Sequence, residues 1–280
     1  MRYFVISDIH GFYTEMKLEL DKAGFNINNP DHALVSCGDL FDRGHENRKV
    51  LEFVMSVPEE RRFLVMGNHD ENLWEIINRG RGISGADFHN RTVATIKELA
   101  NKRKNLPDCV EKLRHDQLLQ EYFACLRNYF ATEHYIFVHG WLPYYDGEDN
   151  KLHYSLDASH DDWKSARWQC GFYEWFYQMR DEKEFGIEVA DTRTVVCGHW
   201  HSSYAHARFH GAGEEFPAKH CSWKKHCHFE PFADDRIIGI DACTAYTRKV
   251  NVLVIDEPSG EATFEKTYEY EPLFRKKDAR

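Results

Sequence analysis

The chain has 280 residues, 42% of them hydrophobic and 14% aromatic, which is enough for a buried core, and no linker divides it into separate domains. Its formal charge of −10 argues against stable binding to nucleic acid, because such binding usually rests on a basic face that displaces counterions from phosphates. No apolar run reaches the length of a membrane span and no signal-peptide pattern opens the chain, so we expect a cytoplasmic protein without a membrane partner.

Short runs rich in Val, Ile and Phe alternate along the chain with stretches of helical periodicity. The runs predict strands at residues 3–7, 33–37, 62–66, 134–138, 193–197, 236–240 and 249–256. The periodic stretches predict helices at residues 12–23, 45–56, 70–79, 87–104 and 110–129, with Pro107 as a breaker between the last two. This alternation favours an α/β fold with a parallel or mixed sheet in a single domain spanning residues 1–280.

Three segments interrupt this alternation. Residues 86–130 form a helical insertion, and residues 143–166 and 202–232 form loop insertions. The loop at 143–166 is rich in Asp, Tyr and His and is long for a connector, so we expect either a substrate-facing loop or a mobile insertion. Aromatic residues are dense around these loops; they either cover the sheet edge or stack on an aromatic or nucleotide substrate.

Five blocks of polar side chains each follow one of the expected strands. They occupy residues 7–11, 38–44, 67–70, 138–140 and 198–201. Because parallel strands of an open α/β sheet end at one common edge, where ligands bind, residues far apart in sequence converge there. The blocks therefore predict one site.

The blocks supply carboxylate, amide oxygen and imidazole groups. The candidate metal ligands are Asp8, His10, Asp39, Asn68, His139, His199 and His201. This mixture suits Mn, Fe or Zn, with Mn favoured, and is too rich in nitrogen for a dedicated Mg or Ca site. Seven ligands are too many for one ordinary ion, so we expect two divalent ions about 3.5–4 Å apart, sharing Asp39 and activating water for attack on phosphorus.

The order of the blocks is D-x-H-G, G-D-x-x-D-R-G, G-N-H, H-G and G-H-x-H. This order resembles the signature of the calcineurin-like metallophosphoesterases, and most closely their phosphoprotein (Ser/Thr) phosphatase branch of bacteria and phages. The resemblance covers residues 8–201, and residues 240–255 resemble the closing strand pair of that fold. It implies a β-sandwich of mixed sheets flanked by helices.

The resemblance also assigns roles to the blocks. It implies that the first metal is held by Asp8, His10, Asp39 and His201, and the second by Asp39, Asn68, His139 and His199. It further implies that His69 protonates the leaving oxygen, that Asp42 holds and tunes His69, and that Arg43 binds phosphate oxygens.

The same branch uses a second arginine, placed between the H-G and G-H blocks, to bind phosphate. Arg167 is the candidate, since its spacing is right and the neighbouring Trp168 could fix its side chain, and Arg180 is the fallback. An ordinary surface arginine at a helix start is the alternative interpretation of Arg167.

Departures from the pattern bear on the substrate. Trp141 follows His139-Gly140 where Ser/Thr phosphatases usually have a second glycine, Asp70 replaces a glutamate, and the C-terminal substrate-loop motif of the eukaryotic enzymes is missing. The sequence predicts a metal-dependent phosphatase that hydrolyses phosphomonoesters, resembling a Ser/Thr protein phosphatase. A nucleotide hydrolase acting on dinucleoside polyphosphates or cyclic phosphodiesters is the alternative, followed by a non-catalytic scaffold of the same fold.

Two further groups of residues are weighed outside these blocks. Residues 220–228 hold a Cys/His cluster of the right side-chain types for a structural zinc, but the spacing matches no standard finger, and a surface loop is the simpler interpretation. The eight cysteines of the chain are scattered, several of them in apolar runs, which favours free thiols over disulfides.

Overall fold

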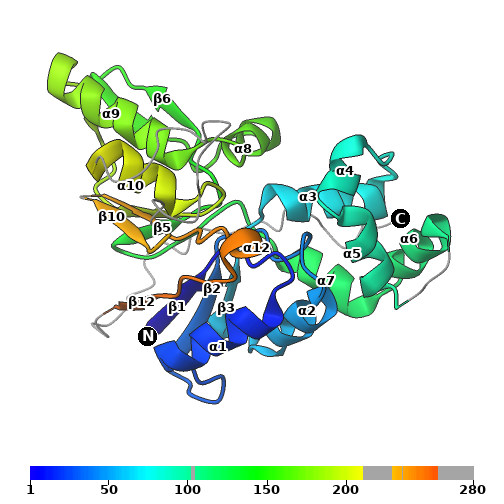
Figure 1. Cartoon of the computed structure of the whole chain (residues 1–280). Coiled ribbons are helices and arrows are strands. Elements are labelled where there is room, and N and C mark those ends of the chain that lie inside the picture. The colour runs from blue at the N-terminus through cyan, green and yellow to red at the C-terminus, as the bar shows by residue number, and fades with distance from the viewer. Residues whose placement is uncertain (102–104, 211–228, 235, 258–280) are drawn as a thin grey trace.

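The computed structural model describes residues 1–101, 105–210, 229–234 and 236–257, with side chains described up to residue 206 in the second of these ranges. Two sheets dominate the described part of the chain (Figure 1). The first has the order β12-β1-β2-β3, formed by Leu253–Asp256, Arg2–Ile6, His32–Ser36 and Arg62–Leu64. The second has the order β10-β11-β9-β5-β4, formed by Phe232–Asp234, Ile237–Gly239, Thr194–Cys197, Tyr135–Phe137 and Phe130–Ala131.

Both sheets are mixed. In the first, β1, β2 and β3 run parallel and β12 pairs antiparallel with β1. In the second, β11, β9 and β5 run parallel while β10 and β4 are antiparallel edge strands. The predicted α/β β-sandwich of mixed sheets is confirmed.

The two sheets face each other across an apolar layer. Successive residues of a strand point to opposite faces, so Val5 and Val35 face the second sheet while Phe4 and Leu34 face the helices outside. Phe137 and Val196 contribute from the second sheet. Burial on both faces explains why these strands appear in the sequence as continuous apolar runs.

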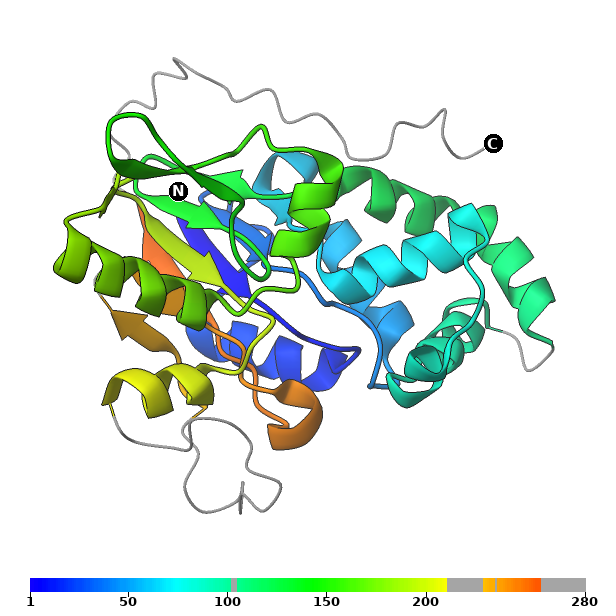
Figure 2. The same cartoon turned by 90° about the horizontal axis from the view of Figure 1, so that it is seen from above.

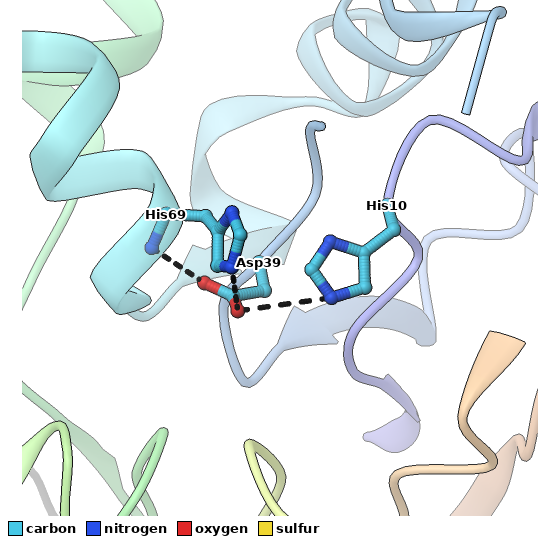
Figure 3. Close-up of side chains that lie close together, drawn as sticks. All are labelled: His10, Asp39 and His69. Atoms are coloured by element: carbon cyan, nitrogen blue, oxygen red, sulfur yellow. Dashed lines mark hydrogen bonds and ion pairs between the residues drawn. The ribbon is translucent and has the colours of Figure 1, made fainter. Parts of the chain in front are cut away.

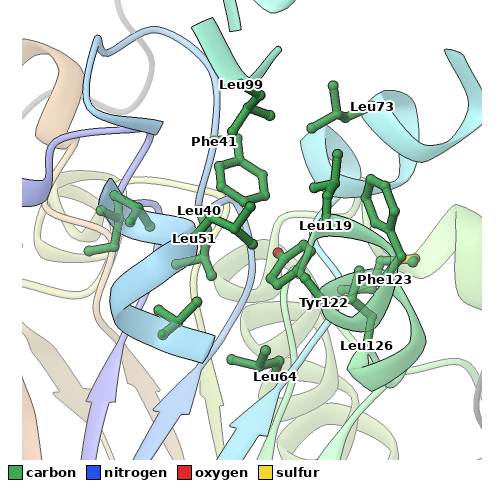
Figure 4. Packing of buried hydrophobic residues seen from close by; sticks show 14 of the residues in the cluster. Leu40, Phe41, Leu51, Leu64, Leu73, Leu99, Leu119, Tyr122, Phe123 and Leu126 are labelled. Atoms are coloured by element: carbon green, nitrogen blue, oxygen red, sulfur yellow. The ribbon is translucent and has the colours of Figure 1, made fainter. Parts of the chain in front are cut away.

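Helices cover the outer face of the first sheet and extend beyond its β3 edge (Figure 2). They are α1 (Tyr13–Ala23), α2 (Asn47–Ser56), a 3₁₀ turn (Glu59–Arg61), α3 (Asn68–Trp74) continued by a π-helical turn (Glu75–Arg79), α4 (Gly85–His89), α5 (Thr92–Leu99), α6 (Leu106–Arg114) and α7 (Gln117–Cys125). Figure 4 shows their shared core, in which Phe41 packs edge-on against Tyr122.

A second group of elements covers the outer face of the second sheet. It contains α8 (His160–Ala166), α9 (Gly171–Phe185), α10 (Ser202–His210) and a small sheet of β6 (Tyr144–Asp146), β7 (Lys151–Tyr154) and β8 (Glu188–Val189). The short helix α12 (Thr244–Thr247) follows β11. The core of this group includes Trp141, Trp163 and Trp175.

Several element predictions are wrong. Pro107 lies in the first turn of α6, where a missing N–H costs nothing, so it does not break a helix, although α5 ends at Leu99 and α6 begins only at Leu106. A further break at His115 and Asp116 divides the helix predicted at 110–129 into α6 and α7. The helix predicted at 87–104 is two helices, α4 and α5. The strand predicted at 249–256 pairs only from Leu253 onward.

The segments predicted as loops contain regular structure. Residues 143–166 form the β6–β7 hairpin and α8, and the segment at 202–232 opens with α10. The helix α9 was not predicted, because its buried side consists mainly of Phe172 and Trp175 near its start while its charged second half faces solvent.

Six cysteines lie among the described residues, and all six are free thiols, as expected. Five are buried, and Cys125 is partly exposed. None of the helices within the described ranges combines the length and the apolar composition that crossing a bilayer requires.

Candidate active site

The five predicted blocks lie just beyond the carboxyl ends of β1, β2 and β3 in one sheet and of β5 and β9 in the other. Since each set of strands runs parallel, the polar loops meet along one edge of the sandwich. Backbone bonds tie the loops together: Asp8 N donates to Gly38 O at 3.0 Å, and Gly198 N donates to His139 O at 2.8 Å.

Strained backbone is concentrated in these loops. Among the described residues, eleven non-glycine residues have a positive φ, and six of them are predicted site residues: Asp8, His10, Asp39, Asp42, Arg43 and His199. Such conformations cost about 1–3 kcal/mol each and persist where surrounding structure enforces them. A Cβ at Gly198 would overlap Ser7 Oγ and Asp8 Oδ2, so close packing excludes a side chain there.

Three ring orientations are fixed by backbone carbonyls. His10 Nδ1 lies 2.9 Å from Phe41 O, His139 Nδ1 lies 2.7 Å from Cys37 O, and the His199 ring bonds to the Trp168 carbonyl. A carbonyl only accepts, so each of these ring nitrogens donates. In His10 and His139 the other nitrogen, Nε2, is therefore left as a lone-pair donor for a metal.

Asp39 lies at the centre of the cluster (Figure 3). Its Oδ2 lies 3.9 Å from His10 Nε2, 4.0 Å from His69 Nε2 and 3.5 Å from His139 Nε2. Its Oδ1 accepts from the His69 backbone N–H at 2.9 Å. Two groups with donor atoms within 4.8 Å of one another, His10-Asp39-His69 and Asp39-His139-His199, share this carboxylate.

The other predicted ligands surround these two groups to different degrees. Asp8 Oδ1 lies 3.9 Å from His10 Nε2, and Asp8 Oδ2 accepts from Ser7 Oγ and from His199 N. Asn68 Oδ1 lies 2.9 Å from His139 Nε2. His201 belongs to neither group and stacks on Tyr204, with ring centroids 5.5 Å apart, so its place as a ligand stays a prediction.

The charges at the cluster suit a cation. Burial would raise the pKa of Asp39, but the facing imidazoles, His139 first, hold it well below its usual range. Burial lowers the pKa of His10 far below its ordinary value and that of His199 to about 3, so both rings are neutral and able to ligate. Within the described ranges, no Lys or Arg forms an ion pair with Asp8 or Asp39.

Buried carboxylates without a cationic partner are costly unless a metal compensates them. Here they stand beside two imidazoles that present Nε2, those of His10 and His139, and beside the amide oxygen of Asn68. This donor set fits divalent Mn, Fe or Zn. The residues present therefore fit the two ions expected from the sequence.

His69 has the surroundings of a proton donor. Its Nδ1 lies 2.8 Å from Asp42 Oδ2, and the same carboxylate oxygen accepts from Thr92 Oγ1 at 2.6 Å. Burial opposes the charged ring, but the carboxylates of Asp39 and Asp42 outweigh it and raise the pKa of His69. Arg43 Nη2 lies 3.4 Å from His69 Nε2, which places a partly exposed guanidinium beside this ring.

Arg167 is buried rather than on the surface. Its guanidinium makes a bidentate pair with Glu71, at 3.3 and 3.0 Å, and donates to Asn128 Oδ1 at 2.8 Å. Arg180 is exposed on α9 and bonds to Asp181, so the structure does not bring the fallback arginine to the cluster. The Cys/His cluster at 220–228 lies outside the described residues.

Sequence reasoning missed several polar residues that support the site. Asp70 Oδ2 accepts from the backbone N–H groups of Asp39 and Gly67, and Asp70 Oδ1 accepts from the Tyr122 hydroxyl. Burial raises the pKa of Asp70 to about 7, and it does the same for Asp241, which follows β11. Asp70 is the last residue of the block at 67–70, and Asp241 lies two residues after the end of β11, so position at the end of a block or strand was the available signal for both residues. Thr92 lies in a different segment and had no such signal.

The two-sheet sandwich carries a cluster of carboxylates and imidazoles that suits divalent cations. Beside this cluster lie the His69–Asp42 pair and the partly exposed guanidinium of Arg43. Together these features define a metal-dependent phosphoester hydrolase. The chain matches the family model of the calcineurin-like phosphoesterases over residues 1–203, and it belongs to that family. The resemblance drawn from the motifs is thereby confirmed.

Two curated relatives match shorter segments. The asymmetrical bis(5'-nucleosyl)-tetraphosphatase PrpE of Bacillus subtilis (strain 168) is 36% identical over 111 residues, which is 37% of this chain and 45% of that protein. The symmetrical bis(5'-nucleosyl)-tetraphosphatase of Buchnera aphidicola subsp. Acyrthosiphon pisum (strain 5A) is 41% identical over 73 residues, 26% of each chain. These matches span less than half the length of either relative.

A solved structure shares the fold over most of the chain. The cold-active protein-tyrosine phosphatase of a psychrophilic Shewanella superposes with a TM-score of 0.52 at 14% identity, covering 91% of this chain and 75% of that one. At this level of identity the likeness concerns the fold alone.

Proposed function

We propose that this protein hydrolyses a phosphoanhydride bond of dinucleoside polyphosphates. The observation that carries the proposal is the buried cluster around Asp39, with Arg43 and His69 beside it, in a chain whose relatives include two bis(5'-nucleosyl)-tetraphosphatases. Of the alternatives left open by the sequence, those relatives favour the nucleotide hydrolase over the phosphomonoesterase.

The seven predicted ligands would hold the two divalent ions in the sets expected from the sequence. When bound, such ions activate water and neutralise phosphate charge. Arg43, partly exposed beside His69, binds phosphate oxygens of the substrate, and the two N–H groups of Arg167 not engaged by Glu71 and Asn128 add to this binding. His69 delivers a proton to the leaving oxygen, and Asp42 is a positioning residue that orients its ring.

A phosphomonoester, in particular a phosphorylated Ser or Thr of a protein, is the second candidate. The His69–Asp42 pair favours it, because a serine or threonine alkoxide is a poor leaving group that gains much from protonation. A nucleoside phosphate leaves as a stable anion and needs an acid less. Turnover should therefore depend more strongly on His69 with the phosphomonoester than with the dinucleoside polyphosphate, while the preference between the two substrates separates the candidates.

The test compares a dinucleoside tetraphosphate with a phosphoserine peptide, in the presence of Mn, for wild type and His69→Ala. We expect kcat/KM for the tetraphosphate to exceed that for the peptide at least tenfold. We also expect His69→Ala to cost roughly 10²–10⁴-fold on the peptide and clearly less on the tetraphosphate. His89→Ala, which changes an exposed histidine of α4, is the matched control.

A tenfold preference for the peptide would overturn the proposal in favour of the protein phosphatase. Chromatography of the products shows which phosphoanhydride bond of the tetraphosphate is cleaved. Symmetrical hydrolysis yields two nucleoside diphosphates, and asymmetrical hydrolysis yields a nucleoside triphosphate and a nucleoside monophosphate. Parallel assays with p-nitrophenyl phosphate and bis-p-nitrophenyl phosphate compare the rate of hydrolysis of a phosphomonoester with that of a phosphodiester.

The proposal also covers the native metal, the partner and the cellular location of the protein. The mixture of nitrogen and oxygen donors supports Mn, with Fe or Zn as alternatives, and metal analysis of the purified protein tests it. A phosphorylated small molecule or protein is the expected partner, without stable nucleic acid binding, and a cytoplasmic location stays a prediction.

A further inference from the structure

Trp168 is the feature of the site that the chemistry above leaves unused. It directly follows Arg167 at the end of α8, and 51% of its surface is exposed. Three of the other described tryptophans, Trp141, Trp163 and Trp175, are each 1% exposed. An exposed aromatic ring that borders a site offers a flat apolar surface that a ligand can cover.

Trp168 makes two contacts with the predicted metal ligand His199. Its carbonyl accepts a hydrogen bond from the His199 ring, which fixes that ring. Its indole meets the same ring edge-on, with centroids 5.8 Å apart at 86°, and His199 in turn lies 4.8 Å from His139. The exposed indole is therefore in direct ring contact with one predicted ligand of the second metal, His199, and one ring further from another, His139.

The neighbours of Trp168 hold its backbone in place. Its N–H donates to Ser165 O at 3.0 Å, and the preceding Arg167 is anchored to Glu71 of α3. An exposed ring on a backbone fixed from both sides is preorganised, so little conformational freedom is lost when a ligand covers it. The ring thus offers a flat apolar face directly after Arg167, the buried arginine whose remaining N–H groups are proposed above to bind phosphate.

We propose that Trp168 is a substrate-binding residue that stacks on a nucleobase of the dinucleoside polyphosphate. This inference rests on the proposed function, since it identifies the part of the same substrate that lies beyond the reacting phosphates. Stacking on an indole tolerates any base, because every base has a π-face. The residue therefore favours nucleotides over phosphates without a base and discriminates little between adenine and guanine.

The first test measures kcat/KM for diadenosine tetraphosphate and for inorganic tripolyphosphate. Both substrates contain phosphoanhydride bonds, but only the first carries a nucleobase. Trp168→Ala lowers kcat/KM for the dinucleotide about 5- to 100-fold and leaves tripolyphosphate within about twofold. Trp168→Phe keeps most of the dinucleotide activity. Tyr177→Ala, which removes an exposed aromatic side chain of α9 that packs on Arg180, changes neither substrate.

An equal loss on both substrates would overturn the inference, because it would mean that Trp168 supports His199 and does not contact the base. Unchanged activity on both would overturn it as well.

Equilibrium binding separates this inference from the proposed function. Titration calorimetry on the Mn-loaded protein measures the affinity of ADP relative to pyrophosphate, which requires no turnover. In wild type ADP binds more tightly, and Trp168→Ala removes that advantage. If wild type fails to cleave the dinucleotide but keeps a Trp168-dependent advantage for ADP, the proposed function fails and the stacking role stands. If ADP binds no more tightly than pyrophosphate in wild type, the stacking role is wrong.

Discussion

The site has two sides that differ in how far their side chains are buried. The helical side comes from β2, β3, α3 and α5 and carries Asp39, Asp42 and His69, which are 1%, 0% and 4% exposed. The sandwich side comes from β5, β9 and α8 and includes His199, partly exposed, and Trp168, 51% exposed. The helical side is thus buried except at the partly exposed Arg43, whereas the sandwich side keeps accessible surface at His199 and Trp168 beside the buried His139 and Arg167.

The difference suits the two tasks proposed for the site, which are proton transfer and recognition of the substrate. Proton transfer needs fixed geometry, and on the helical side each functional group is held by another buried group, as Thr92 holds Asp42 and Asp42 holds His69. Recognition of a substrate needs surface that can be covered; the proposed stacking residue Trp168 has such surface on the sandwich side, and Arg43 has some on the helical side. The pair formed by Glu71 of α3 and Arg167 after α8 joins the two sides.

The largest effect is expected from the carboxylate of the helical side that both ion-binding groups share. Asp39→Asn keeps the size of the side chain but removes the charge, so we expect loss of bound metal and a fall in turnover of roughly 10³-fold or more. Metal analysis and assays with added Mn measure both quantities, and circular dichroism checks the fold. Asp87→Asn, which changes a buried carboxylate paired with Arg81, is the control. A variant of Asp39 that keeps two ions and normal turnover would remove the shared-ligand assignment.

The next effect concerns the pair that joins the two sides. Glu71→Ala leaves the Arg167 guanidinium buried without its carboxylate, and we expect a loss of about 3–5 kcal/mol in the free energy of unfolding. Denaturant titration measures it. Lys164→Met removes a more exposed ion pair, with Glu75 of the π-helical turn, and should cost at most about 1 kcal/mol.

The double variant Glu71→Met/Arg167→Met tells whether Arg167 also binds substrate. Apolar side chains of similar size restore much of the stability, since a buried ion pair is often replaceable without loss. If Arg167 also binds phosphate, KM rises in this stable variant. A stable double variant with unchanged KM would make the pair purely structural and restrict substrate binding to Arg43 and Trp168.

On both sides of the site, some residue positions could be predicted from the sequence and others could not. The strands and the ligand blocks follow from local patterns, because a buried parallel strand must be apolar and a ligand must follow its end. Hence the sandwich fold and the meeting of Asp39 with His10, His69 and His139 were predicted closely.

The remaining contacts depend on residues distant in sequence. Thr92 reaches Asp42 across 50 positions and Tyr122 reaches Asp70 across 52, so no local pattern contains either bond. The burial of Arg167 depends in the same way on Glu71, 96 positions earlier. The hairpin at 143–166 was missed because polar, exposed strands lack the apolar alternation on which prediction relies.

The smallest expected effect is a change in the pH dependence of stability, measured on the metal-free protein, and it concerns the carboxyl group of Asp70 on the helical side. Burial first, and then the charge of Asp39, raise the pKa of Asp70 to about 7, far above that of an aspartate in the unfolded chain. The folded protein therefore binds a proton that the unfolded chain has released, so this contribution to stability is complete below about pH 4 and is lost as the pH rises towards 7. One pKa unit corresponds to about 1.4 kcal/mol, which makes the whole change a few kcal/mol at most.

Asp70→Asn cannot titrate but keeps one oxygen as an acceptor, so this part of the slope should disappear from denaturant titrations made in EDTA between pH 4 and 7. Asp146→Asn, which changes an exposed carboxylate of β6, should leave the slope as it is in wild type. If Asp70→Asn keeps the wild-type slope, the proton is not held at Asp70, and the buried support behind Asp39 is looser than its hydrogen bonds to Gly67 and Tyr122 indicate. If the slope disappears, the carboxyl group of Asp70 supports the helical side of the metal-free protein in a form that is protonated below about pH 7.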